Sequence, residues 1–116
     1  SSMVIQIKVN QKKILFLGDT GTESSEKLIK NQGKNLKSEI VQVAHHGQAG
    51  ATEELYKIVN PKICLWPTID WIWDNIKDGQ KNAGTLKTME TRQWMENLNV
   101  KQNYLAQEEI KSKKIF

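Results

Sequence analysis

Residues 13–21 read Lys-Ile-Leu-Phe-Leu-Gly-Asp-Thr-Gly, and this stretch decides the fold. The four consecutive apolar residues from Ile14 to Leu17 are typical of a strand that is buried on both faces. Gly18 ends the strand, and Asp19 follows at once. Because ligands and metals collect at the carboxyl ends of strands in α/β folds, an acidic side chain at this point is a candidate functional residue.

A second strand is expected immediately before this one. Apolar side chains occupy every second position there, namely Met3, Ile5, Ile7 and Val9. This alternation predicts a half-buried strand. A short polar turn at residues 10–12 predicts that it pairs with strand 13–17 as an antiparallel hairpin.

Two strand–helix units follow the hairpin. A helix is predicted over residues 22–32, with Thr20 and Glu23 at the spacing of a capping box and Gly33 as its stop. A strand at 39–44 leads to a second helix that begins after Thr52, and another strand spans 62–66. Helical crossovers of this length predict parallel neighbours in one sheet, with the hairpin at one side. The predicted fold class is therefore α/β, a mixed sheet with flanking helices.

The last third of the chain has a weaker pattern. A short helix is expected at 69–76 and a longer one at 85–97, and the segments 100–106 and 110–116 are expected to form a closing pair of strands. With 116 residues the chain is expected to form a single domain, residues 1–116.

Composition excludes several classes of protein. Hydrophobic residues make up 38% of the chain and charged residues 26%, as in ordinary globular proteins, and no apolar run approaches the ~20 residues of a membrane helix. The single cysteine, Cys64, excludes an internal disulfide and every Cys-Cys metal motif. The net charge of +4 is compatible with contact to nucleic acid or an anionic surface, although scattered lysines are more commonly a solvated face.

A metal site is the main chemical hypothesis. Asp19 follows one buried strand, and His45-His46-Gly47 follows the next strand along the chain. Carboxylate oxygen and imidazole nitrogen are both good ligands for zinc, manganese or iron, and parallel strands would bring these residues to one edge of the sheet. The alternatives are a turn or helix cap for Asp19 and a surface position for the two histidines.

Aromatic residues form a cluster after the strand at 62–66. Core packing explains Trp73 best, whereas Trp66 and Trp71 could line a pocket beside the strand ends or cover a protein contact. Cys64 could in principle pair with a histidine as a nucleophile, but its place inside an apolar strand favours a core residue.

These residues resemble a known family. The segment Leu-Phe-Leu-Gly-Asp-Thr-Gly, followed by Ile-Val-Gln-Val-Ala-His-His-Gly and Val-Asn-Pro-Lys-Ile, is similar to the C-terminal half of a metallo-β-lactamase-fold hydrolase. The nearest branch includes the hydrolase domain of competence proteins of the ComEC type. The resemblance covers about residues 1–66, and it implies that the sheet is one half of an αββα sandwich.

The resemblance also implies roles for the candidate residues. Asp19 would bridge two metal ions, expected to be zinc, and His46 would be the last ligand of the second metal, with His45 beside it or in its place. A metal-activated hydroxide would attack an ester, phosphoester or amide bond. The substrate itself, a small molecule or a nucleic acid, stays open; the aromatic cluster, rather than the resemblance, makes Trp66 and Trp71 the candidate substrate-side residues.

One departure from the family is large. The family's first metal site uses a His-x-His-x-Asp-His motif upstream of the Gly-Asp step, whereas this chain has only two histidines, both in one loop. We therefore expect the C-terminal part of a larger domain, which is inactive by itself and need not hold a metal. Half of a two-sheet fold would leave an apolar sheet face uncovered, which predicts self-association. The alternative is a non-catalytic module on the same scaffold that binds protein or nucleic acid.

Overall fold

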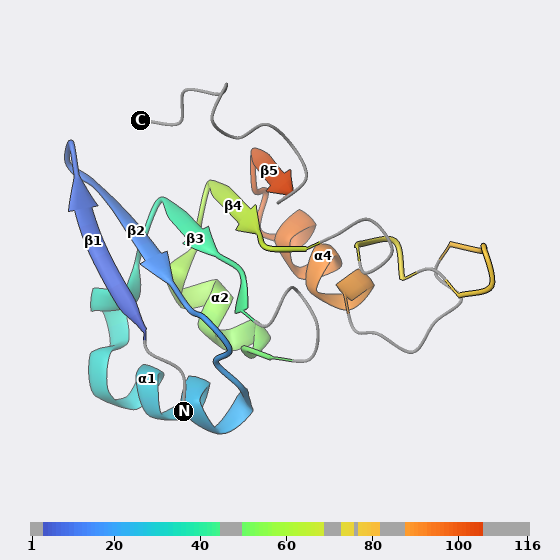
Figure 1. The fold of residues 1–116 in the computed structure, drawn as a ribbon. Coiled ribbons are helices and arrows are strands. Elements are labelled where there is room, and N and C mark those ends of the chain that lie inside the picture. Colours follow the sequence, from blue (N-terminus) through green and yellow to red (C-terminus); the bar gives the residue numbers. More distant parts are fainter. Residues whose placement is uncertain (1–3, 45–49, 69–72, 76, 82–87, 106–116) are drawn as a thin grey trace.

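A computed structural model describes residues 4–44, 50–68, 73–75, 77–81 and 88–105. They form an α/β fold with one mixed β-sheet and helices packed on it (Figure 1). The strands lie in chain order across the sheet: β1 (Ile5–Val9), β2 (Lys12–Phe16), β3 (Ile40–Gln42), β4 (Ile63–Trp66) and β5 (Gln102–Leu105). The helices are α1 (Thr22–Gln32), the 3-10 helix η1 (Gly33–Leu36), α2 (Glu53–Val59) and α4 (Thr88–Asn97). The predicted fold class is confirmed.

The predicted hairpin and crossovers are present. β1 pairs antiparallel with β2, and β2, β3, β4 and β5 are all parallel to one another. The hairpin turn consists of Asn10 and Gln11, which both have positive φ, +49° and +65°. A two-residue turn of this kind matches the twist of the two strands and sets the register in which Val9 faces Lys12.

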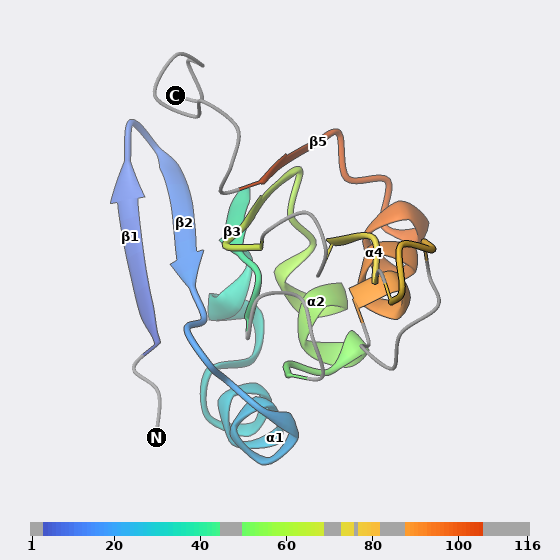
Figure 2. The same cartoon turned by 45° about the vertical axis from the view of Figure 1, so that its right-hand side comes forward.

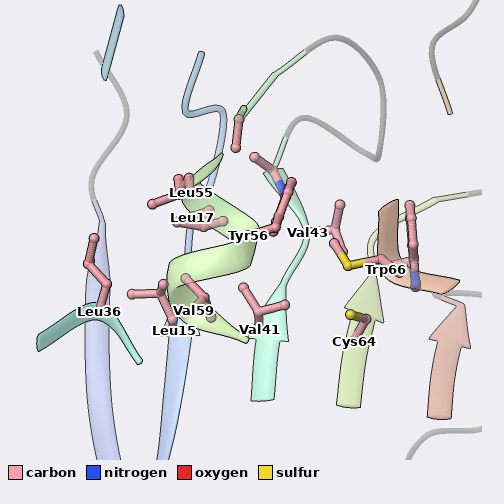
Figure 3. Close-up of a cluster of buried hydrophobic side chains, with 13 residues drawn as sticks. Leu15, Leu17, Leu36, Val41, Val43, Leu55, Tyr56, Val59, Cys64 and Trp66 are labelled. Atoms are coloured by element: carbon pink, nitrogen blue, oxygen red, sulfur yellow. The ribbon is translucent and has the colours of Figure 1, made fainter. Parts of the chain in front are cut away.

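The core lies on one face of the sheet, under the helices (Figure 2). Its strand residues are those that alternate toward the helices, and its helical residues come mainly from α2. They include Leu15, Leu17, Val41, Val43, Cys64, Trp66, Leu55, Tyr56 and Val59, all at most 1% exposed (Figure 3). α2 therefore covers the centre of the sheet, with α1 and α4 beside it.

The opposite face is covered over its centre but open at β1. Ile14 of β2 and Ile40 of β3 are 6% and 1% exposed, whereas Ile5 and Ile7 of β1 are 43% and 44% exposed. The prediction of a half-buried strand is therefore wrong about burial over β1, Ile5–Val9. The register places Ile7 beside Ile14, on the face away from the helices, and β1 turns its polar residues toward the helix side.

The predicted cap of α1 is also different. The N-cap is Gly21, without a side-chain hydrogen bond, and Thr20 is buried with its hydroxyl donating to the Leu17 carbonyl oxygen. The Thr20–Glu23 capping box is wrong because Thr20 closes the turn after β2 instead. The predicted stop at Gly33 is confirmed: its φ is +48° and its N–H donates to the Ile29 carbonyl oxygen.

The C-terminal elements confirm part of the predicted pattern. α4 ends at Asn97, as expected for the helix at 85–97, and β5 lies within the predicted strand at 100–106. β5 pairs with β4 in parallel. The expected strand at 110–116, and most of the expected helix at 69–76, lie outside the described residues.

Glu39 connects neighbouring strands through its side chain and its backbone, and its ionisation is expected to affect stability in acid. A carboxylate oxygen of Glu39 accepts from the backbone N–H of Lys13 at 2.8 Å, and the Glu39 carbonyl accepts from Lys62 and Ile63. The hydrogen bond from Lys13 lowers the pKa of the Glu39 carboxyl group below its usual value. The bond therefore stabilises the fold fully above the unfolded-state pKa of about 4.3 and is lost as the pH falls through the lower folded-state pKa.

Replacing Glu39 by glutamine is expected to lower the free energy of unfolding by about 1 kcal/mol at neutral pH, because a charge-assisted hydrogen bond becomes a neutral one. Urea unfolding at neutral and acidic pH measures the change. The difference in unfolding free energy between the variant and the native protein should shrink as the pH falls below the pKa of a free glutamate carboxyl group. Glu53→Gln, at an exposed helical pair, is the control and should change little. A Glu39→Gln penalty that persists undiminished in acid would contradict the role of the ionised group.

Candidate functional site

Asp19 lies at the carboxyl end of β2, where a tight turn presents its side chain to solvent. Gly18 has a φ of +57°, a conformation that favours glycine, and the Thr20 N–H donates to the Leu17 carbonyl oxygen at 3.1 Å. Leu17 and Thr20 are fully buried on either side of this turn. Two buried residues thus fix the backbone of the turn from which the exposed Asp19 side chain extends.

The carboxyl end of β3 lies next to this turn. β2 and β3 are parallel, with Phe16 opposite Gln42, so the chain after Phe16 and the chain after Gln42 leave the same edge of the sheet. The end of β3 is held by hydrogen bonds from two backbone N–H groups: Val43 donates to the Leu65 carbonyl oxygen at 2.9 Å, and Ala44 donates to the Tyr56 side-chain hydroxyl at 3.1 Å.

Tyr56 is a buried anchor for this edge. Its side chain is 1% exposed, and burial raises the pKa of its phenol above the usual value, so the hydroxyl stays protonated at neutral pH. Its oxygen accepts from Ala44, the last residue before His45. Thr52, which caps α2 as predicted by accepting from the Leu55 N–H at 3.3 Å, sets the start of the helix that carries Tyr56.

The two predicted histidine ligands, His45 and His46, lie outside the described residues. Within the ranges that the structure describes, no three His, Cys, Asp or Glu side chains lie close enough together to hold a metal ion. Asp19 is therefore the one predicted ligand whose position is described. A carboxylate alone is an incomplete donor set, since a catalytic zinc usually has three protein ligands.

Of the predicted aromatic residues, Trp66 is a core residue and Trp73 lies at the wall of a pocket. Trp66 is 1% exposed, and its ring meets Trp73 edge-on with centroids 4.8 Å apart. Both rings line a hollow of about 290 Å³, together with Arg92, Glu96, Val100 and Asn103. Trp73, predicted as core, is only partly buried, and Trp71 lies outside the described residues.

Arg92 is the residue of this hollow that the sequence analysis missed. Its guanidinium lies over the Trp73 ring, 4.0 Å from the centroid, donates to the Trp73 carbonyl oxygen at 3.1 Å and is 3.5 Å from an Asp74 carboxylate oxygen. These contacts hold a cation at the pocket wall. Arg92 is the only arginine among the 17 basic residues, a signal that could have singled it out.

Cys64 is a core residue, as predicted. Its side chain is fully buried in β4, and burial raises the pKa of its thiol above the usual value. A protonated thiol out of contact with solvent is a poor nucleophile. The nucleophile-pair alternative therefore has no support in the geometry of β4.

The sequence matches no protein-family model and no curated protein at a significant level. None of the helices among the described residues is long and apolar enough to span a bilayer. What the geometry defines is an α/β protein with an exposed carboxylate at the carboxyl edge of its parallel strands.

Proposed function

We propose that this chain is the C-terminal part of a metal-dependent hydrolase of the metallo-β-lactamase type. One observation carries the proposal: the neighbouring parallel strands β2 and β3 end at the same sheet edge, and each is followed by a residue of ligand type, Asp19 after β2 and His45-His46 after β3. The carboxyl ends of neighbouring parallel strands are where ligands bind in open α/β sheets, which supports a metal site at this edge.

In this proposal Asp19 is the bridging carboxylate, and His46, with His45 as the second choice, is the imidazole ligand. A bound divalent metal, expected to be zinc, supplies an activated hydroxide for attack on an ester, phosphoester or amide bond. The contribution of this chain is positional. The turn at Gly18 orients the carboxylate, and the Tyr56 hydroxyl holds the backbone immediately before the histidines.

Metal binding by the chain tests the proposal without a substrate. In an amide NMR spectrum, Mn²⁺ is expected to broaden the signals of Asp19, Thr20 and Ala44 selectively, because a paramagnetic ion acts only on nearby nuclei. Val9 and Lys12, at the far ends of their strands, serve as internal controls. Asp19→Ala is expected to raise the Mn²⁺ concentration needed for the same broadening at least tenfold, since the carboxylate is a direct ligand.

Asp78→Ala is the matched control, because Asp78 is an exposed acid in a turn at a separate place in the chain. Selective broadening that Asp19→Ala removes and Asp78→Ala keeps supports the proposal. Broadening that is uniform or equal in the two variants would overturn it, and so would the absence of metal binding in a longer form that supplies the upstream ligands. A longer form that supplies the upstream ligands is further expected to bind about two metal ions per chain and to hydrolyse a generic phosphodiester or ester.

The second candidate function is a non-catalytic binding module. The hollow beside Trp73 and Arg92 favours it, because a fixed guanidinium next to an indole is typical of the centre of a protein contact. Base stacking finds less support: Trp66 is buried, and the guanidinium of Arg92 already covers the Trp73 ring. Loss of partner capture in Arg92→Ala, with metal binding intact, would distinguish this function from the first.

A further inference from the structure

The exposed apolar surface of the described sheet is confined to one edge strand. Ile5 and Ile7 of β1 are 43% and 44% exposed, and they are the large hydrophobic residues that stand out as exposed in the described chain. The adjacent positions on the same face, Ile14 and Ile40, are buried. An apolar surface is therefore available at the β1 edge of the sheet, rather than over the whole face.

The backbone of β1 also has groups available at this edge. Lys8 faces Lys13 in the hairpin, and the Lys13 N–H points away from β1 because it donates to the Glu39 carboxylate on the other side of β2. Two residues that face each other in an antiparallel pair either exchange backbone hydrogen bonds or both turn their backbone N–H and C=O groups away from each other. The backbone groups of Lys8, and of Gln6 two residues earlier, therefore point outward from the sheet.

A side chain of β1 is hydrogen-bonded on the helix side of the sheet. The Gln6 side chain reaches to the helix side, where its Nε2 donates to the Asn35 carbonyl oxygen and to the Ser38 hydroxyl, both at 2.9 Å. In the described part of the chain β1 has one neighbouring strand, β2. It contains neither proline nor a bulge, two devices that commonly block edge pairing.

The sequence of β1 is complementary to itself. Ile-Gln-Ile-Lys-Val reads apolar, polar, apolar, polar, apolar in both directions from Ile7. If two β1 strands meet antiparallel about Ile7, each Ile5 faces Val9 and each Lys8 faces Gln6, so that no two like charges are opposed. The pairs that would exchange backbone hydrogen bonds, Gln6 with Lys8, are also those whose backbone groups point outward. A pairing centred on Lys8 would instead oppose two lysines.

We propose that β1 is the surface through which two copies of this chain associate, by antiparallel pairing of β1 with β1 about a two-fold axis at Ile7. The two five-stranded sheets then form one continuous sheet, with the apolar side chains of both β1 strands in a single row. Such an isologous contact closes as a dimer and leaves no free copy of the same edge. The proposal needs no metal and is independent of the proposed hydrolase.

Sedimentation velocity at protein concentrations from about 20 µM to 2 mM measures the association. The association is expected to be weak, because the contact consists of two short strands. Ile7→Lys is expected to raise the dimer dissociation constant at least tenfold, because it opposes two charges at the axis. Ile7 is already 44% exposed, so the variant should keep its fold. Asn97→Lys adds the same charge on the exposed end of α4 and is the matched control.

A cross-linking experiment tests the register independently of stability. Ile7→Cys places the two new thiols opposite each other in a non-hydrogen-bonded pair, a separation that a disulfide can span, whereas Ile5→Cys places each thiol opposite Val9. Under mild oxidation, Ile7→Cys is expected to form a covalent dimer at least tenfold faster than Ile5→Cys. The native Cys64 is buried and should not compete.

A dimer that Ile7→Lys weakens and Asn97→Lys does not, with selective cross-linking at position 7, supports the proposal. A monomer at every concentration would overturn it. Equal dissociation constants for the two lysine variants, or equal cross-linking rates for the two cysteine variants, would overturn it as well, because either result places the contact elsewhere.

Discussion

Replacing Trp66 by alanine is expected to lower the free energy of unfolding by about 3–5 kcal/mol. The Trp66 side chain is 1% exposed at the end of β4, packs edge-on against Trp73 and donates from its indole Nε1 to the Asn103 side-chain oxygen at 2.8 Å. The substitution removes the largest fully buried side chain of the described core and the side-chain link between β4 and β5. Since small domains are stable by only about 5–15 kcal/mol, the loss is a large fraction of the total.

Urea unfolding followed by circular dichroism measures this change. Trp73→Ala is the matched control, because the same ring is removed from a partly buried position, and its cost should be less than half as large. Trp66→Phe is expected to fall between them at about 1–2 kcal/mol, because it keeps an aromatic ring but loses the donor to Asn103, which is exposed and can bind water instead. A Trp66→Ala cost no greater than that of Trp73→Ala would contradict the assignment of Trp66 to the core.

Replacing Tyr56 by phenylalanine is expected to cost about 1–3 kcal/mol, although it removes a single oxygen atom. That oxygen accepts the N–H of Ala44, which is 1% exposed, so the variant leaves a buried donor without its acceptor. The local consequence is as important as the global one. Ala44 directly precedes the histidine pair, and its amide should exchange with solvent markedly faster in the variant.

Amide hydrogen exchange and urea unfolding together test this expectation. Tyr104→Phe makes the same chemical change at a hydroxyl that donates to the exposed Gln102 side chain, which can turn to water, and it should cost less. If Tyr56→Phe accelerates exchange at Ala44 and also weakens Mn²⁺ broadening at Asp19, the anchor and the candidate metal edge are coupled. Unchanged exchange at Ala44 would show that Tyr56 does not hold this end of β3.

Local sequence signals predicted most of the elements because their causes are local. α1 was predicted at residues 22–32 and is observed at Thr22–Gln32, since an apolar stripe and a following glycine mark both its body and its end. The Thr52 cap and the left-handed Asn60 before Pro61 likewise define α2. Chain length between strands then favours parallel crossovers, which makes the order of the sheet predictable.

The failures have two causes, a competing local turn before α1 and contacts between distant residues. Thr20 has the right spacing for a capping box, but burial of its hydroxyl against the Leu17 carbonyl oxygen competes with that role. The alternating residues of β1 indicate a strand, yet alternation cannot say which face is covered. Arg92 reaches its position over Trp73 only through the packing of α4 beside β4.

The sequence alone determined that a buried strand ends at Gly18, that Asp19 follows it, and that a second unit ends before the histidine pair. These features depend on side-chain size, glycine conformation and periodicity, which act within a few residues. The tertiary structure decided that Trp66 is buried, that Arg92 lies over the Trp73 ring, and that Ile5 and Ile7 are exposed at the sheet edge. Register and layer packing set these outcomes, because they join residues far apart in the chain.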